Sequence, residues 1–133
     1  MLNRIKSENA PAAIGSYSVG TEYQGILYLS GQLPIEPIVG EIKVNDIERQ
    51  TKQSMENIKA ILESNNSNIN HIIKTTVFLK DIQDFSSFDK IYKEYFTSNY
   101  PSRSAFEVAN LPKNSLIEIE VIAAKKSDGG EKN

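Results

Sequence analysis

The sequence predicts an α+β fold, in which two helices of different lengths cover one face of a mixed β-sheet and the elements follow the order ββαβαββ. Apolar residues recur at three- and four-residue steps in two segments, which is typical of helices with one buried face. Shorter runs rich in β-branched and aromatic residues indicate the strands. The chain has 133 residues, the usual length of one domain. We expect a single domain over residues 1–125 and a flexible, polar tail over residues 126–133.

The first half of the chain predicts an irregular lead-in, a buried strand and a long helix. Residues 9–20, NAPAAIGSYSVG, are rich in proline, glycine and small residues, which favours an irregular segment leading into a strand. Residues 26–31, ILYLSG, are typical of a largely buried strand. Asn45 or Asp46 can cap a helix, because a short side-chain oxygen accepts hydrogen bonds from the free N–H groups at a helix start. The buried face of that helix is predicted to contain Ile47, Thr51, Met55, Ile58 and Leu62.

The second half predicts a strand, a second helix and a β-hairpin. Residues 72–79, IIKTTVFL, are β-branched and aromatic and therefore predict a strand. A helix is expected to begin at a cap at Asp84. Its buried stripe is predicted to contain Phe85, Phe88, Ile91 or Tyr92, and Tyr95 or Phe96. The runs at 103–108 and 116–124 are joined by a turn-rich linker, which favours a hairpin.

Both faces of the last predicted strand carry apolar residues. One face holds Ile117, Ile119, Val121 and Ala123, and the other holds Leu116, Glu118, Glu120, Ile122 and Ala124. Because two helices cover only one face of a sheet, the second apolar face predicts self-association of the chain.

Composition excludes several classes of site. The chain has no cysteine, so it forms no disulfide and offers no thiolate ligand or nucleophile. The one histidine, His71, is expected at a loop or a strand end, and acidic residues occur singly, so no metal site is expected. The net charge of −2 gives no general attraction for nucleic acid. With no signal-like or membrane-spanning apolar run, we expect a cytoplasmic protein that does not enter a membrane.

Arg103 is the first candidate for a functional residue. Only three arginines stand against twelve lysines, and the planar guanidinium suits a bidentate grip on a carboxylate that lysine cannot reproduce. A surface ion pair is the alternative explanation. Glu118 and Glu120 share one strand face, and the sequence leaves open which of them, if either, faces the arginine.

Four blocks of the sequence resemble the RidA (YjgF) family of enamine/imine deaminases, also labelled the L-PSP endoribonuclease family. The blocks are SENAPAAIGSYSVG, LYLSGQLP, TTVFLKDIQDF and YPSRSAFEVANLPKNSLIEIEVIA, in a resemblance that runs from about residue 4 to residue 125. The resemblance implies a chorismate-mutase-like α+β fold and a homotrimer with sites between subunits. It also implies hydrolysis of 2-iminobutanoate and 2-iminopropanoate to 2-oxo acids and ammonia, with no cofactor or metal.

The resemblance also implies roles for individual residues. Arg103 matches the family arginine that binds the substrate carboxylate, and Glu118 matches the glutamate that positions or activates the attacking water. Tyr17 matches a tyrosine that forms hydrogen bonds in the site. Ser30 and Gly31 match the end of the strand that lines it.

Two substrate-binding positions depart from the family pattern. Ala105 stands where many relatives have cysteine; the family uses this position largely through its backbone, so alanine can keep the role. Asp89 stands where relatives often have asparagine, and its added negative charge is expected to weaken the binding of anionic substrates or to change the substrate range. This keeps open a second hypothesis, a trimeric small-carboxylate-binding or chaperone-like protein with little turnover. A ribonuclease, which is normally expected to show basic grooves and acid–base histidines, is less favoured, since the chain has a net charge of −2 and one histidine.

Overall fold

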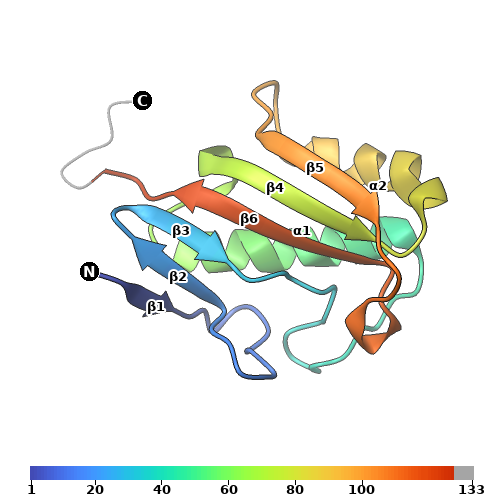
Figure 1. Ribbon diagram of the computed structural model, residues 1–133, viewed down its shortest axis with the longest axis horizontal. Coiled ribbons are helices and arrows are strands. Elements are labelled where there is room, and N and C mark those ends of the chain that lie inside the picture. Colours follow the sequence, from blue (N-terminus) through green and yellow to red (C-terminus); the bar gives the residue numbers. More distant parts are fainter. Residues whose placement is uncertain (128–133) are drawn as a thin grey trace.

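The predicted sheet has six strands in the computed structural model, which describes residues 1–127, and two helices lie behind it (Figure 1). The strands are β1 (Asn3–Ile5), β2 (Gly20–Tyr23), β3 (Ile26–Leu29), β4 (Ile72–Leu79), β5 (Ser102–Glu107) and β6 (Ile117–Ala124). The helices are α1 (Ile47–Ser64) and α2 (Phe85–Tyr92). Short 3₁₀ turns are η1 (Ile69–His71), η2 (Ile82–Asp84), η3 (Lys93–Tyr95) and η4 (Pro112–Asn114). The α+β class is thereby confirmed, and the part of the expected tail at residues 128–133 lies outside the described residues.

The sheet order is β1-β2-β3-β6-β4-β5, and every neighbouring pair is antiparallel except β4 and β5. The predicted hairpin between the last two strands is therefore wrong, because β4 lies between them. The linker over residues 108–116 is longer than the two- to five-residue loops of most hairpins, which lets it pass the end of one strand. Helix α2 supplies the crossover that parallel pairing of β4 and β5 requires.

Both helices follow the predicted stripes. Asp46 caps α1, and its side chain accepts a hydrogen bond from the Arg49 N–H at 3.0 Å. The core positions left open by the sequence are taken by Tyr92, at the end of α2, and by Phe96, which follows the turn η3. Asp84 precedes α2 as predicted, although its side chain makes no capping hydrogen bond.

The short strand β1 is absent from the predicted order. It pairs with β2, with Ile5 opposite Gly20. Three residues are too few to display a period of two, so its sequence carries no strand signal. Backbone pairing with β2 stabilises β1.

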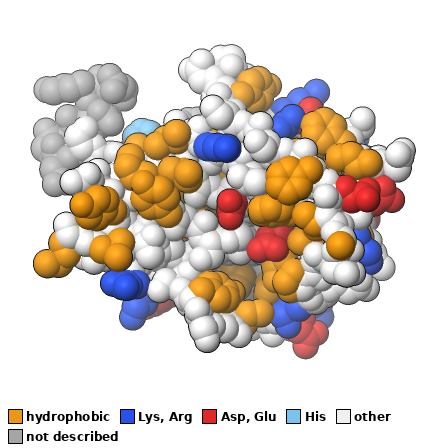
Figure 2. Space-filling view, viewed as in Figure 1, with side chains coloured by type: hydrophobic (Ala, Val, Ile, Leu, Met, Phe, Trp, Pro, Cys, Tyr) orange, Lys and Arg blue, Asp and Glu red, His pale blue; other side chains and the backbone are white. Residues whose placement is uncertain are grey.

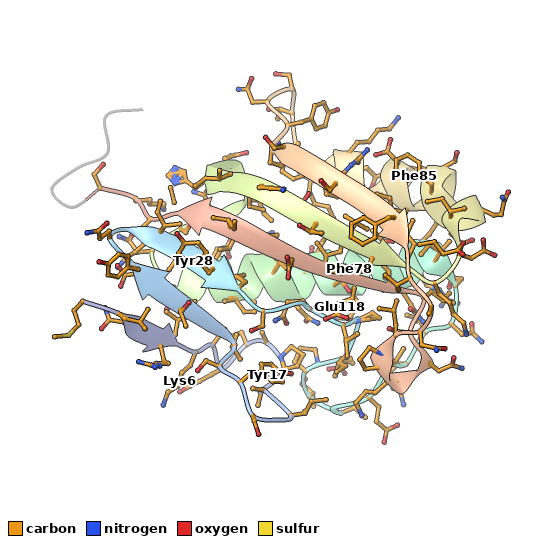
Figure 3. The ribbon with its side chains drawn as sticks, viewed as in Figure 1. Lys6, Tyr17, Tyr28, Phe78, Phe85 and Glu118 are labelled. Carbon is orange, nitrogen blue, oxygen red and sulfur yellow. The ribbon has the colours of Figure 1, made fainter. Side chains whose placement is uncertain are left out.

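The two faces of the sheet differ as predicted. The core packs on one face, where Ile117, Ile119 and Ala123 of β6 are fully buried beneath the helices. The other face is uncovered in one chain, and Figure 2 shows hydrophobic side chains spread over it with acidic groups among them. Tyr28 and Phe78 lie on this uncovered face, as Figure 3 shows. None of the helices in the described part of the chain has the length and apolar character that crossing a membrane requires.

Candidate functional site

Four of the predicted site residues line one open pocket of about 410 Å³ on the uncovered side of the sheet. We call it the glutamate pocket; its lining residues are Ile14, Tyr17, Ser30, Gly31, Leu33, Pro112, Glu118 and Glu120. Figure 3 shows Glu118 on β6 and Tyr17 in the loop beside it, both on that side. The pocket thus joins segments that are about one hundred residues apart in the sequence.

Backbone hydrogen bonds hold the segment after β3 against β6. The Gln32 N–H donates to the Ile119 carbonyl at 2.7 Å, and the Ile119 N–H donates back at 3.2 Å. The Ser30 hydroxyl donates to the Ser18 carbonyl at 2.7 Å, which ties the lead-in loop to the same segment. This pairing fixes the segment beside Glu118.

Gly31 faces the Glu118 side chain closely. A Cβ at position 31 would overlap the Glu118 carboxylate and would lie 2.8 Å from its Cδ. Any other residue at position 31 therefore displaces the carboxylate or the strand end. The φ of Gly31 lies outside the left-handed region, so its backbone conformation does not require glycine. Glycine is required because no side chain fits between the backbone and Glu118.

The environment of Glu118 favours its protonated form. Burial raises the pKa of this half-buried carboxyl, and the negative charge of Glu120 raises it further. No hydrogen bond to its carboxylate is found within residues 1–127. A carboxylate with a raised pKa is a stronger base than an ordinary glutamate, which suits it to accept a proton from water.

Tyr17 is half exposed and its phenol lies in the glutamate pocket. Its hydroxyl oxygen accepts a hydrogen bond from the Ile14 N–H at 3.4 Å. The O–H can still donate to a ligand, because a phenol both donates and accepts.

Arg103 and Asp89 line a second open pocket, of about 390 Å³. We call it the arginine pocket; its lining residues are Asp89, Tyr92, Lys93, Tyr100, Pro101 and Arg103. Nη1 of Arg103 donates to Oδ1 of Asp89 at 2.7 Å, so the ion pair foreseen as the alternative for Arg103 is present, with Asp89 as the partner. The Arg103 Cζ also lies 5.0 Å from the centre of the Tyr92 ring.

Ala105 lies two residues beyond Arg103 on the same strand. Its side chain packs partly buried against the core, opposite Val77 of β4. The Val108 N–H donates to the Leu79 carbonyl. In a parallel pair, every second residue directs its N–H and C=O toward the neighbouring strand. Val108 directs its groups toward β4, so Ala105, three residues earlier, directs its N–H and C=O toward the free edge of β5. The backbone role predicted for Ala105 therefore has an accessible donor and acceptor.

The two pockets lie on opposite sides of the sheet. Arg103 is opposite Thr75, which is fully buried on the helix side and hydrogen-bonded to the Tyr92 hydroxyl at 2.8 Å. Glu118 is opposite Phe78, on the uncovered side. Within one chain, the residues predicted for a single site thus form two separate half-sites.

Sequence reasoning missed several lining residues. Tyr92 was predicted only as core, and Lys93, Tyr100 and Pro101 were not singled out. The spacing of Asp89 and Lys93, four residues apart on one helix face, is a signal that could have placed the lysine beside Asp89. Nothing in the local pattern of Leu33 or Pro112 indicates a place in the glutamate pocket.

His71 ends the turn η1, directly before β4, as expected of a strand-end histidine. Its Nδ1 is buried without a hydrogen-bond partner in the described chain. Across residues 1–127, no group of three or more His, Cys, Asp or Glu side chains is arranged to hold a metal ion.

Comparisons with known proteins cover nearly the whole chain. The family profile described as Endoribonuclease L-PSP matches residues 7–125. A Lactococcus lactis relative, which bears the name AldR and a provisional description as a regulator, is 54% identical over 123 residues, 92% of this chain and 98% of the relative. An Escherichia coli relative named 2-iminobutanoate/2-iminopropanoate deaminase is 43% identical over 129 residues, 95% of this chain and 100% of the relative.

Solved structures agree with the fold. The crystal structure of E. coli TdcF with bound serine matches with a TM-score of 0.88 and 39% identity, covering 93% of this chain and 99% of that one. The six-stranded mixed sheet and its two helices are therefore shared with relatives of known structure. The chain belongs to the Endoribonuclease L-PSP family, also called the YjgF/RidA family.

Proposed function

We propose that this protein is an imine deaminase that hydrolyses 2-iminobutanoate and 2-iminopropanoate to 2-oxo acids and ammonia. The observation that carries the proposal is the glutamate pocket, where a carboxyl of raised pKa lies beside Tyr17, Ser30 and Gly31. The E. coli relative named for this activity is similar over its entire length, which supports the same assignment.

We further propose that the active site forms between subunits of a homotrimer. One chain presents Arg103 and Glu118 on opposite sides of its sheet, so neither half-site has both a carboxylate-binding cation and a water-activating base. The uncovered apolar face, which includes Tyr28 and Phe106, offers a surface for packing against a neighbour. The arginine pocket of one subunit then meets the glutamate pocket of the next.

The chemistry follows from the two half-sites. Arg103 of one subunit binds the substrate carboxylate and orients the iminium carbon. Glu118 of the neighbour accepts a proton from water as the water oxygen bonds to that carbon. The nitrogen of the resulting tetrahedral intermediate takes this proton, and the C–N bond breaks. The hydroxyl proton passes to the departing ammonia, which leaves the 2-oxo acid and ammonium.

A protein that binds small carboxylates with little turnover is the second candidate. The ion pair of Arg103 with Asp89 favours it, because the guanidinium already has one carboxylate partner. The serine bound to E. coli TdcF is a small carboxylate held by a relative. An RNA substrate is less favoured, given the net charge of −2 and the single histidine.

A coupled assay tests the proposal. Threonine dehydratase generates 2-iminobutanoate, and the release of 2-oxobutanoate is followed with and without this protein. We expect the native protein to accelerate release and heat-denatured protein to leave it at the spontaneous rate. Unchanged release, together with measurable binding of 2-oxobutanoate, would favour the binding protein instead.

A further inference from the structure

The arginine pocket contains charges of both signs. Arg103 is held by its 2.7 Å hydrogen bond to Asp89 and by the rings of Phe85, Phe88 and Tyr92, whose centres lie 5.0–5.5 Å from its Cζ. The pair is accessible, because the Arg103 side chain is 27% exposed and that of Asp89 is 39% exposed. A ligand in this pocket therefore meets a carboxylate as well as a guanidinium.

Arg103 keeps donors for a ligand while it is paired. A guanidinium has five N–H donors in a planar fork. Asp89 is the one hydrogen-bond acceptor that the described residues provide for them, and it engages only Nη1. A ligand carboxylate can bind another edge of the fork without displacing Asp89. Asp89 then acts on the ligand through its charge.

The sign of that effect depends on the ligand. A 2-oxo acid is an anion, which the Asp89 carboxylate repels. A protonated 2-imino acid, or a 2-amino acid, has the same carboxylate plus a positive nitrogen on the adjacent carbon, which Asp89 attracts. We propose that Asp89 makes the arginine pocket selective for zwitterionic 2-imino and 2-amino acids over anionic 2-oxo acids.

The other charge in the pocket strengthens this argument. Lys93 lines the pocket one helical turn beyond Asp89. Without Asp89, Lys93 and Arg103 would present two unopposed positive charges, which favours any anion. With it, the pocket retains the carboxylate grip of Arg103 and loses much of the general attraction for anions.

The inference rests on the proposed binding of a carboxylate by Arg103 and deepens the proposed function. In a deaminase, the substrate is zwitterionic when its imine is protonated, and the product is a 2-oxo anion. A pocket that prefers the former retains substrate and releases product. The same selectivity would operate in a binding protein that performs no chemistry.

The test compares two probes with one carbon skeleton, 2-oxobutanoate and L-2-aminobutanoate. Their dissociation constants are measured by calorimetry on the full chain and on Asp89→Asn, which keeps the hydrogen-bond acceptor and removes the charge. We expect 2-oxobutanoate to bind the variant roughly three- to tenfold more tightly. The constant for L-2-aminobutanoate should change by less than about twofold, since the zwitterion has no net charge.

Asp84→Asn is the matched control. Asp84 stands at the start of α2, makes no capping hydrogen bond, and lies outside the arginine pocket. The Asp84→Asn substitution removes one carboxylate charge at the start of the same helix. It should leave the ratio of the dissociation constants for 2-oxobutanoate and L-2-aminobutanoate unchanged. High salt should shrink the effect of Asp89→Asn, because mobile ions screen charges at the protein surface.

Any outcome in which the ratio of the two dissociation constants does not shift in favour of 2-oxobutanoate overturns the inference. Equal tightening of both probes would make Asp89 a simple competitor for Arg103, and equal weakening would make it only a support for the guanidinium. Failure of both probes to bind would remove the carboxylate site itself. The proposed deaminase activity is judged separately by turnover, so normal turnover with an unchanged ratio rejects the selectivity alone.

Discussion

The carboxylate of Glu118 lies half-buried against Gly31, two residues from Glu120 along β6. Burial and the neighbouring charge both raise its pKa. A carboxyl whose pKa is higher in the folded than in the unfolded chain binds more protons when folded. Its contribution to stability is present below its ordinary pKa and is lost as the pH rises through the raised value. At a pH above the raised pKa, the ionised Glu118 therefore destabilises the fold.

Glu118→Gln separates catalysis from stability. It keeps the shape and removes the base, so imine hydrolysis should fall by roughly two to four orders of magnitude. The variant should stay folded and bind 2-oxobutanoate. At pH 7.5 it should melt no lower than the native protein, and any gain should vanish at a pH below the ordinary carboxyl value. Thermal melts at the two pH values, with the coupled assay, check both statements.

Glu120→Gln is the control on the same strand face. It should keep turnover within about tenfold, since the substitution keeps the shape of the side chain and removes only a charge beside Glu118. It should move the acid limb of the profile of kcat/KM to lower pH, because it removes one cause of the raised pKa of Glu118. Loss of turnover in Glu120→Gln with none in Glu118→Gln would reassign the water-activating group.

Arg103→Lys keeps the positive charge of Arg103 and loses the guanidinium fork. Loss of a charge-assisted hydrogen bond costs about 1.5–3 kcal/mol, so kcat/KM should fall roughly ten- to a hundredfold. Arg49→Lys is the control, because Arg49 is paired with Asp46 on the exposed surface of α1. An Arg103→Lys activity within twofold of the native value would make Arg103 a structural ion-pair residue.

The resemblance named candidate site residues, but the sequence could not predict their arrangement. The resemblance named Tyr17, Gly31, Arg103 and Glu118, and the structure groups three of these in one pocket. The position of Arg103 across the sheet could not be predicted, because it depends on strand order. Successive side chains of a strand point to opposite faces of the sheet, which the sequence shows. Which strand lies beside which is known only from the strand pairing.

At the scale of elements, α2 and β4 are joined by one buried polar contact. The Tyr92 hydroxyl and the Thr75 hydroxyl are 2.8 Å apart, and Thr75 is fully buried. Burial raises the pKa of the Tyr92 phenol, while its hydrogen bond with Thr75 opposes that rise. The contact positions the ring that lies beneath Arg103.

Tyr92→Phe should cost about 1–3 kcal/mol in the free energy of unfolding, because it leaves the buried Thr75 hydroxyl unpaired. Adding Thr75→Val removes that unpaired group, so the double variant should lose less than the sum of the two single losses. Urea unfolding of the four proteins checks this cycle. Strictly additive losses would mean that the two hydroxyls do not interact.

The elements with a clear period were predictable, and those defined by pairing were not. Helix α1 and strand β4 match their predicted limits, since a long stripe and a β-branched run are local signals. Strand β1 is too short to show a period. The last two strands have the sequence pattern of a hairpin, but β4 lies between them and pairs with both. No local feature of the sequence shows that β4 takes this place.

At the scale of the whole molecule, we propose that an active site needs two chains. The glutamate pocket contains four of the predicted site residues and the arginine pocket contains two, and the pockets lie on opposite sides of one sheet. A closed trimer of 14.9 kDa chains, with a mass of about 45 kDa, would bring three such pairs together. A monomer in sedimentation at micromolar concentration would contradict that assembly.

Mixed oligomers of Arg103→Lys and Glu118→Gln test the central claim most directly. Each variant alone should retain a tenth of the native activity or less. If every site takes Arg103 from one subunit and Glu118 from its neighbour, subunits unfolded and refolded together in equal amounts form intact sites. Random assembly then restores about a quarter of the native imine hydrolysis. If both groups act from the same chain, every site carries one defect, and the mixture stays as inactive as the separate variants.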